Sequence, residues 1–259
     1  MAGRTTKTVL DLSFKNKMAG YNVARPFRLK KEDEALLLQH CPFYQGLTAQ
    51  QKVKFQARMI KFICMKQFET KSGLKLSNEM VLLISAAAIQ LTFGLSDYRF
   101  LHFNKIIIYP EKFYSEQLQQ FHLGQTHSHG HLSFSWKHLL SGYENAHDNI
   151  NLGLHEFAHA LFLNHVAGKK DDYHFETAFE NWKQQGSVDY FELKRNNSPY
   201  LRSYAQANFM EFFAVCVECF FETPDQLAYH HPSIHQSLKD LLNLNPSKIL
   251  ANIPLQKTA

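Results

Sequence analysis

Apolar residues recur along this chain with the spacing of α-helices, interrupted by short polar and turn-forming segments. The segment Asn78–Thr92 is apolar at most of its positions, which predicts a strongly apolar helix. A turn is expected over Pro42–Gly46, because proline and glycine interrupt the pattern there. Helical character predicts further helices over Glu32–His40, Thr48–Lys66, Asn149–Leu163, Phe175–Gln184, Tyr204–Val215 and Ser233–Leu242.

Two shorter segments have the pattern of β-strands. Lys105–Tyr109 is a β-rich run that ends at Pro110, and His131–Trp136 alternates between polar and apolar residues. Because few strands are set among many helices, the sequence predicts an α+β fold with helices packed around a small mixed sheet. Residues 1–31 are polar and basic and are expected to form a flexible arm, followed by one domain over residues 32–259.

Composition fits a soluble enzyme. The chain has 259 residues, of which 45% are hydrophobic, enough to bury a substantial core. Its formal net charge is +5, but the basic residues are dispersed, so a nucleic-acid partner is not indicated. The longest strongly apolar run, Met80–Leu91, is too short to cross a bilayer, and residues 1–31 contain no apolar core of a secretory signal. We therefore expect a cytoplasmic protein with no membrane partner.

The motif His155-Glu156-Phe157-Ala158-His159 is the main candidate for chemistry. Residues four apart lie on one face of a helix, so His155 and His159 can direct two imidazoles at one metal ion. Glu156 would then lie beside the open position of the metal, where it can take a proton from water. The pattern is typical of zinc-dependent peptidases.

Two residues compete for the place of the third ligand. His165 has the spacing found in metzincins, but those proteins need glycine at the position of Phe162 to turn the chain towards the metal. Glu211 lies in the apolar run Phe209–Val215, where a lone carboxylate needs a positive partner. Two histidines and a glutamate form a known catalytic zinc set, so Glu211 is the favoured ligand.

Tyr204 precedes Glu211 by two helical turns. If the helix extends back to this residue, the phenol can approach the oxyanion of a substrate in the transition state. Taken alone, the position of Tyr204 favours an amphipathic residue at the boundary of the core.

These features together resemble the Mlc titration factor A family of glucose-regulated zinc metallopeptidases. The resemblance spans roughly residues 36–250, in the order of the family. The matching stretches are Cys41–Tyr44, Phe68–Leu95, Ile106–Pro110, Leu132–Trp136, Asn151–His159, Tyr204–Ala205, Glu211–Val215 and Phe220–Pro224.

The resemblance implies a zincin-like fold, similar in its catalytic core to anthrax lethal factor, and activity on short aminopeptidase-type peptides. It implies Zn²⁺ as the cofactor, with His155, His159 and Glu211 as ligands. Glu156 would be the general base, and Tyr204 would assist in the transition state. The resemblance also places the segment Leu132–Trp136 along the substrate cleft, where Phe134 and Trp136 would either line a pocket or face the core.

The chain departs from the enteric members of this family at Phe162. Those members usually have aspartate after the leucine that Leu161 matches, so the partner that orients a ligand histidine is left unassigned. The named partner of the enteric members is a transcriptional repressor. A regulatory protein that sequesters such a repressor is therefore the alternative to a peptidase, but a sequestering protein would not need Glu156.

Two other clusters carry weaker signals. Cys216 and Cys219 form a single C-x-x-C with no second pair, which favours buried free thiols over a structural zinc site. His127, His129 and His131 alternate and would share one face of a strand. Because no acidic residue accompanies them, a loop or strand edge near the cleft is favoured over a second metal site.

Overall fold

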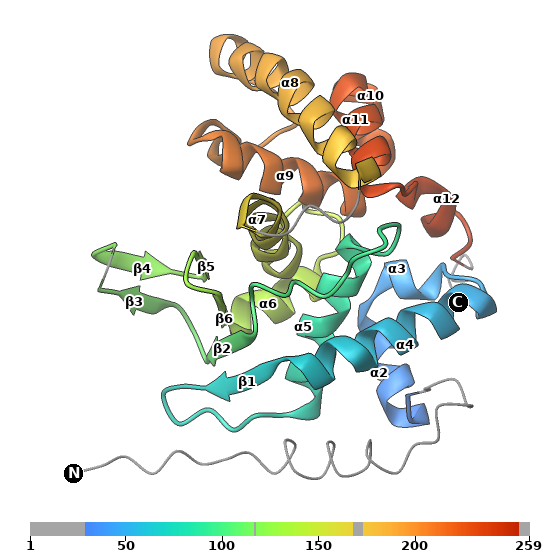
Figure 1. Cartoon of the computed structure of the whole chain (residues 1–259), viewed down its shortest axis with the longest axis vertical. Helices are drawn as coiled ribbons and strands as arrows, with labels where there is room; N and C mark the ends of the chain where they lie inside the picture. Colours follow the sequence, from blue (N-terminus) through green and yellow to red (C-terminus); the bar gives the residue numbers. More distant parts are fainter. Residues whose placement is uncertain (1–28, 117, 168–172, 254–259) are drawn as a thin grey trace, which may run out of the picture.

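A computed structural model describes residues 29–116, 118–167 and 173–253 (Figure 1). A small sheet lies on one side of helix α7, and the helices α8 to α11 gather on the opposite side. The elements are α2 (Lys31–His40), α3 (Pro42–Gln45), α4 (Ala49–Met65), β1 (Gln67–Thr70), α5 (Asn78–Leu91), β2 (Lys105–Tyr109), β3 (Phe113–Ser115), β4 (Gln120–His122), β5 (Gly124–His127), β6 (His131–Ser135), α6 (Trp136–Glu144), α7 (Leu152–Ala167), α8 (Tyr173–Asn196), the 3-10 turn η1 (Ser203–Gln206), α9 (Phe209–Glu222), α10 (Pro224–His230), α11 (Pro232–Leu242) and α12 (Pro246–Leu250).

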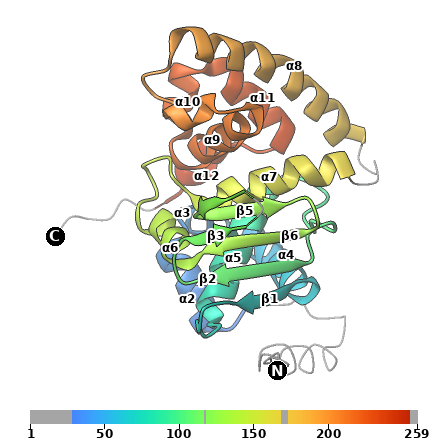
Figure 2. The same ribbon diagram turned by 90° about the vertical axis from the view of Figure 1, so that its left-hand side faces the viewer.

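The main sheet has the strand order β1-β2-β6-β5. Strands β1, β2 and β6 are parallel, and β5 pairs antiparallel with β6 at the edge (Figure 2). One face of the sheet is apolar because side chains alternate along each strand, and it buries Ile106, Ile108, Leu132 and Phe134. The rings of Phe134 and Phe157 lie 5.7 Å apart, so this face packs against α7. Strands β3 and β4 form a separate two-stranded hairpin.

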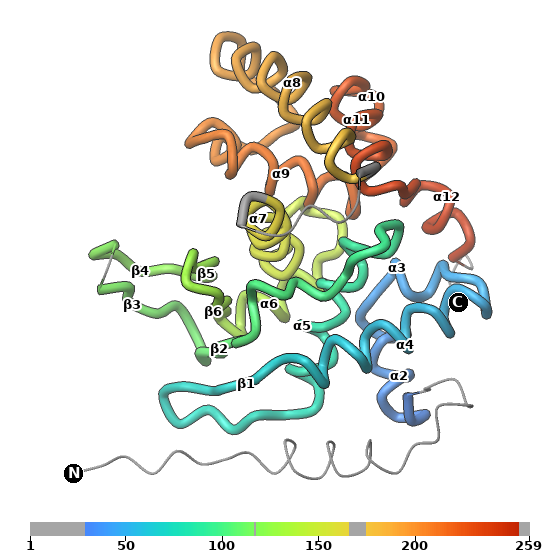
Figure 3. Tube along the Cα trace, viewed as in Figure 1, coloured from blue at the N-terminus to red at the C-terminus, as the bar shows by residue number. Residues whose placement is uncertain are grey.

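Helix α5 forms the centre of the core. All residues from Met80 to Leu91 are buried, as the nearly continuous apolar pattern predicts. The hydroxyl of Ser77 accepts a hydrogen bond from the amide of Met80 and caps the helix. The helix contacts α2, α4 and α7, and it thereby supports the helix that carries the histidine motif (Figure 3).

The predicted α+β class is confirmed, and strand β2 has the predicted bounds. The turn expected over Pro42–Gly46 contains the short helix α3, in which proline occupies the first position because it needs no amide donor there. Strands β1, β3, β4 and β5 and helices α6, α10 and α12 were not predicted. They are short or polar, and neighbouring elements stabilise them. Most of the expected arm, residues 1–28, lies outside the described residues.

The helix predicted over Tyr204–Val215 is wrong in one respect. Tyr204 belongs to η1, and α9 begins only at Phe209. Asn208 separates the two, because its side chain accepts hydrogen bonds from the amides of Met210 and Glu211, both at 3.0 Å. Conversely, α8 runs well beyond the predicted Phe175–Gln184.

In the described parts of the chain, no helix is long and apolar enough to span a membrane.

Candidate active site

Helices α7 and α9 bring His155, His159 and Glu211 together. The two histidines are one turn apart on α7, and their Nε2 atoms lie 3.1 Å from each other. Glu211 lies in the first turn of α9, and its Oε2 is 3.0 Å from Nε2 of His155 and 3.3 Å from Nε2 of His159. Within residues 29–116, 118–167 and 173–253, this is the only group of three or more side chains with metal-ligand geometry.

The geometry of these three atoms fits a tetrahedral metal ion. Zinc bonds of about 2.0–2.1 Å separate tetrahedral ligand atoms by roughly 3.3 Å. The three observed separations, 3.0, 3.1 and 3.3 Å, form a nearly equilateral triangle of this size. Nδ1 of His159 and Oε2 of Glu211 are buried without a hydrogen-bond partner. A cation bound to the triangle would compensate the Glu211 carboxylate.

Phe162 of α7 packs against aromatic side chains of α8 and α9. Phe162 on α7 contacts the rings of Phe179 and Phe213, at centroid distances of 5.1 and 6.0 Å. Because Phe162 continues the helix and packs in this way, α7 does not turn after the motif. His165 therefore lies apart from the triangle. Its Nδ1 is 3.2 Å from Oε1 of Glu176, and its ring lies 4.1 Å from that of Phe179.

Glu156 is buried beside the triangle, with 4% of its surface exposed. The hydroxyl of Thr126 on β5 donates a hydrogen bond to its Oε2 at 2.8 Å. Gly124 leaves room for the carboxylate, since a Cβ at that position would lie 2.4 Å from Oε1 of Glu156. Burial raises the pKa of Glu156, and the neighbouring histidines oppose this shift. The edge strand thus holds an acid–base group beside the metal-ligand triangle.

Tyr204 reaches the site from η1 rather than from α9. Its ring centroid lies 5.9 Å from that of His155, and about half of its surface is exposed. Burial of the other half, followed by the charge of Glu211, raises the pKa of the Tyr204 phenol to about 12. The phenol therefore stays protonated at neutral pH and can donate a hydrogen bond.

The partner of the candidate ligand His155, left unassigned by the sequence, is Glu218. Its Oε2 lies 3.1 Å from Nδ1 of His155, and Arg202 donates a hydrogen bond to the same oxygen. A carboxylate at Nδ1 holds the imidazole in the tautomer whose Nε2 is free to bind a metal. Although burial of the ring acts to lower it, the Glu218 and Glu211 carboxylates raise the pKa of His155 when no metal ion is bound, so a metal ion at Nε2 would displace a proton. The sequence does contain a signal that could have identified Glu218. It is a second acidic residue in the same apolar helix, two helical turns after Glu211.

Glu222 lies one turn further along α9 and is also buried. Its Oε1 accepts a hydrogen bond from the side chain of Asn151 at 3.1 Å, while its Oε2 has no hydrogen-bond partner. Burial, with smaller contributions from the charges of Asp148 and Glu218, raises the pKa of Glu222 to about 8. The folded protein therefore keeps this carboxyl protonated in a range of pH where the unfolded chain has released the proton.

Glu222→Gln is expected to make stability less dependent on pH. Because the folded pKa lies above the ordinary value, Glu222 costs the wild type stability as pH rises from about 5 to 8. Glutamine keeps the hydrogen bond to Asn151 without this titration. Between about pH 5 and 8, the melting temperature of the variant should therefore rise by several degrees relative to that of the wild type. The exposed Glu192→Gln is the control. If the difference in melting temperature between Glu222→Gln and the wild type is the same at all pH values, the expected role of Glu222 is wrong.

The segment expected along the cleft, Leu132–Trp136, does not lie at a free edge. Strand β6 is paired on one side with β2 and on the other with β5, so its backbone has no free groups for a substrate. Phe134 is fully buried against α7, and Trp136 begins α6. The expectation failed because the polar strand β5 was not recognised from the sequence.

The three alternating histidines do not share one strand. His127 ends β5, His131 begins β6 and His129 lies in the connecting turn, so the segment forms a hairpin. The rings of His127 and His131 stack at 3.8 Å. Burial and the neighbouring histidines lower the pKa of His127 to about 4. The predicted position of the histidines at a strand edge is confirmed.

The sequence also predicted that Cys216 and Cys219 are buried free thiols, and this is confirmed.

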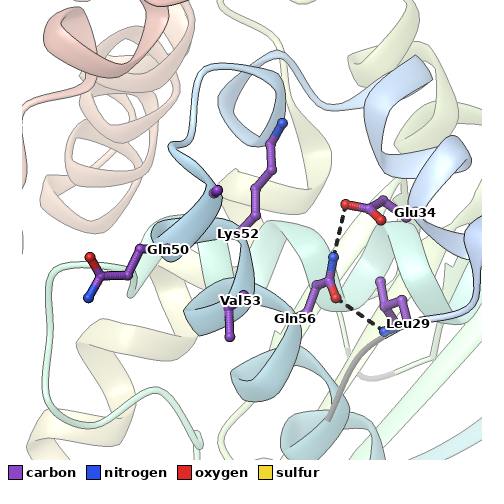
Figure 4. Close-up of a pocket in the computed structure, with 7 residues that line it drawn as sticks. Leu29, Glu34, Gln50, Lys52, Val53 and Gln56 are labelled. Atoms are coloured by element: carbon purple, nitrogen blue, oxygen red, sulfur yellow. Dashed lines mark hydrogen bonds between the residues drawn. The ribbon is translucent and has the colours of Figure 1, made fainter. Parts of the chain in front are cut away.

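A surface pocket between α2 and α4 is separate from this site (Figure 4). Gln56 lines this pocket, donating a hydrogen bond to Glu34 and accepting one from the amide of Leu29. None of the residues of the metal-ligand triangle or their partners lines it.

The fold and site have the features of a metallopeptidase of mixed α and β structure. The chain belongs to the glucose-regulated metallo-peptidase M90 family, whose sequence pattern matches residues 16–242. This confirms the family indicated by the sequence, and it implies a metal ion as cofactor.

Relatives of the chain cover most of its length. An uncharacterized protein of Synechocystis, slr2042, is 28% identical in an alignment of 236 positions that covers 82% of this chain and 84% of that protein. Mlc titration factor A of Escherichia fergusonii is 24% identical over 242 residues, covering 82% and 86%. Mlc titration factor A of Salmonella arizonae is 24% identical over 247 residues, covering 84% and 92%.

Proposed function

We propose that the protein is a zinc-dependent peptidase of the gluzincin type, with a zincin-like arrangement of sheet and motif helix. His155, His159 and Glu211 are the proposed zinc ligands. The observation that carries the proposal is the triangle of their three ligand atoms, next to which the buried carboxylate of Glu156 is held by Thr126. Membership in a metallopeptidase family supports it.

Each side chain has a role in this proposal. A zinc ion held by His155, His159 and Glu211 would supply Lewis acidity to a substrate carbonyl and to water. Glu156 accepts the proton of the attacking water and passes it to the leaving amine. The protonated phenol of Tyr204 donates to the oxyanion that develops on the carbonyl oxygen. Glu218 orients His155.

Strand β5 is the proposed site of substrate backbone pairing. In an antiparallel pair, alternate residues direct their backbone groups towards the partner strand. The amide of Ser135 donates to the carbonyl of Leu123, and Gln125 lies opposite Ser133. The backbone groups of Gly124 and Thr126 therefore point away from β6, towards the free edge. An extended peptide can add there as a further strand, beside Glu156.

The preferred substrates are proposed to be short peptides. The edge offered by β5 is only four residues long, so few backbone hydrogen bonds can form, and remote binding energy is small. Cleavage of aminopeptidase-type substrates fits this limit.

The test compares chromogenic amides of single amino acids, longer peptides with blocked amino termini and a denatured protein, each with zinc-loaded protein. The amides and short peptides should be cleaved fastest, and a chelator should abolish cleavage. Preference for long blocked substrates, with no cleavage of free amino termini, would instead indicate an endopeptidase.

A repressor-sequestering role is the alternative, and only the names of the relatives favour it. The relatives from Escherichia fergusonii and Salmonella arizonae are called Mlc titration factor A, a name that refers to titration of another protein. Lack of cleavage in every assay, with retained zinc, would favour this alternative.

A further inference from the structure

Arg202 connects the metal-ligand triangle to the segment that carries Tyr204. Its Nη2 donates a hydrogen bond to Oε2 of Glu218 and lies 3.4 Å from Nδ1 of His155. Its Cζ lies 5.8 Å from the centre of the Tyr204 ring. Arg202 also immediately precedes η1, and its carbonyl accepts a hydrogen bond from the amide of Ala205.

The burial of Glu218 makes this contact important. Only 1% of the Glu218 side chain is exposed, whereas 29% of the Arg202 side chain is exposed. One carboxylate oxygen accepts from the backbone amide of Asn151 at 2.8 Å, and the other faces His155 and Arg202. Removing one partner of a buried ion pair leaves an uncompensated charge, which is strongly unfavourable. Arg202 therefore stabilises the buried side chain of Glu218 that orients His155.

We propose that Arg202 and Glu218 form one positioning unit, which couples the binding of zinc at His155 to the placement of Tyr204. The proposal rests on the proposed zinc site. Arg202 acts on the metal through Glu218, because a carboxylate without its arginine is a poorer partner for the imidazole. It acts on Tyr204 through the backbone, because the same side chain anchors the start of η1. Neither residue touches the substrate in this scheme.

The first test measures zinc affinity by competition with a chromophoric chelator, in Arg202→Met, Glu218→Gln and the double variant. Each single substitution should weaken zinc binding about tenfold to a hundredfold, the usual range for a partner of a ligand histidine. The double variant should be little weaker than Glu218→Gln alone, since both changes interrupt one path. Arg202→Lys should bind zinc with intermediate affinity, because it keeps the charge but not the planar guanidinium. Arg195→Met, at an exposed position of α8, is the matched control.

The second test measures hydrogen–deuterium exchange in the peptide that covers residues 203–207, with zinc at saturation. The amides of Ala205 and Ala207 are protected by hydrogen bonds to the carbonyls of Arg202 and Tyr204. Arg202→Met should speed their exchange several-fold, and Arg195→Met should leave it unchanged. If circular dichroism shows that Arg202→Met is unfolded, the exchange measurement is repeated with Arg202→Lys, which changes the side chain less.

Additive losses of zinc affinity in the double variant, or unchanged exchange over residues 203–207, would overturn the coupling. Neither readout requires peptide cleavage. A protein that binds zinc but cleaves nothing would therefore contradict the proposed peptidase while both tests of Arg202 remain decisive. Absence of zinc binding in the wild type would overturn both proposals.

Discussion

Glu156→Gln should retain zinc and lose at least about a hundredfold in turnover, the usual contribution of a positioned acid–base group. Glutamine has nearly the same shape as glutamate and can still accept the hydrogen bond from Thr126, so the site should keep its structure. It cannot take a proton from water at neutral pH. Steady-state kinetics on the best short peptide, with zinc content measured on the same sample, checks this expectation.

The control for this substitution is Glu192→Gln, which makes the same chemical change at an exposed position of α8. It should leave turnover and zinc content unchanged. Near-normal hydrolysis by Glu156→Gln would remove the proposed mechanism, whereas loss of zinc from this variant would show that Glu156 is needed for the metal site itself.

Glu211→Ala should bind zinc far more weakly than the wild type. Structural zinc sites bind with about 10–16 kcal/mol shared among four ligands, so the loss of one ligand removes roughly 3 kcal/mol, or about a hundredfold in affinity. The carboxylate is one corner of the triangle formed with His155 and His159, and alanine offers no donor atom. Metal analysis after dialysis against a weak chelator should find far less than one zinc ion per chain.

His165→Ala is the matched comparison, because His165 is the competing ligand on the same helix. Its ring packs on Phe179 and its Nδ1 faces Glu176, so the substitution should lower the melting temperature without removing zinc. The opposite pattern, with zinc lost from His165→Ala and retained by Glu211→Ala, would show that the ligand assignment is wrong.

The elements that were predicted well are those whose signal is local. The helix around His155 and the buried helix after Ser77 follow from apolar spacing along a continuous stretch. Strand β5 and the turn η1 have no such signal. Both are short, and Gly124 and Thr126 in β5 are small or polar residues that acquire their roles only opposite α7.

The sequence by itself determined the pairing of His155 and His159, because residues four apart share a face of any α-helix. It also determined the placement of Glu156 beside them, and it indicated Glu211 through the cost of a lone carboxylate in an apolar helix. Only the tertiary structure decided how these residues meet. The approach of α9 to α7, the hydrogen bonds of Glu218 to Asn151 and His155, and the arrival of Tyr204 from a separate turn all join residues distant in sequence. Such contacts depend on how whole faces of helices pack, and no local periodicity encodes them.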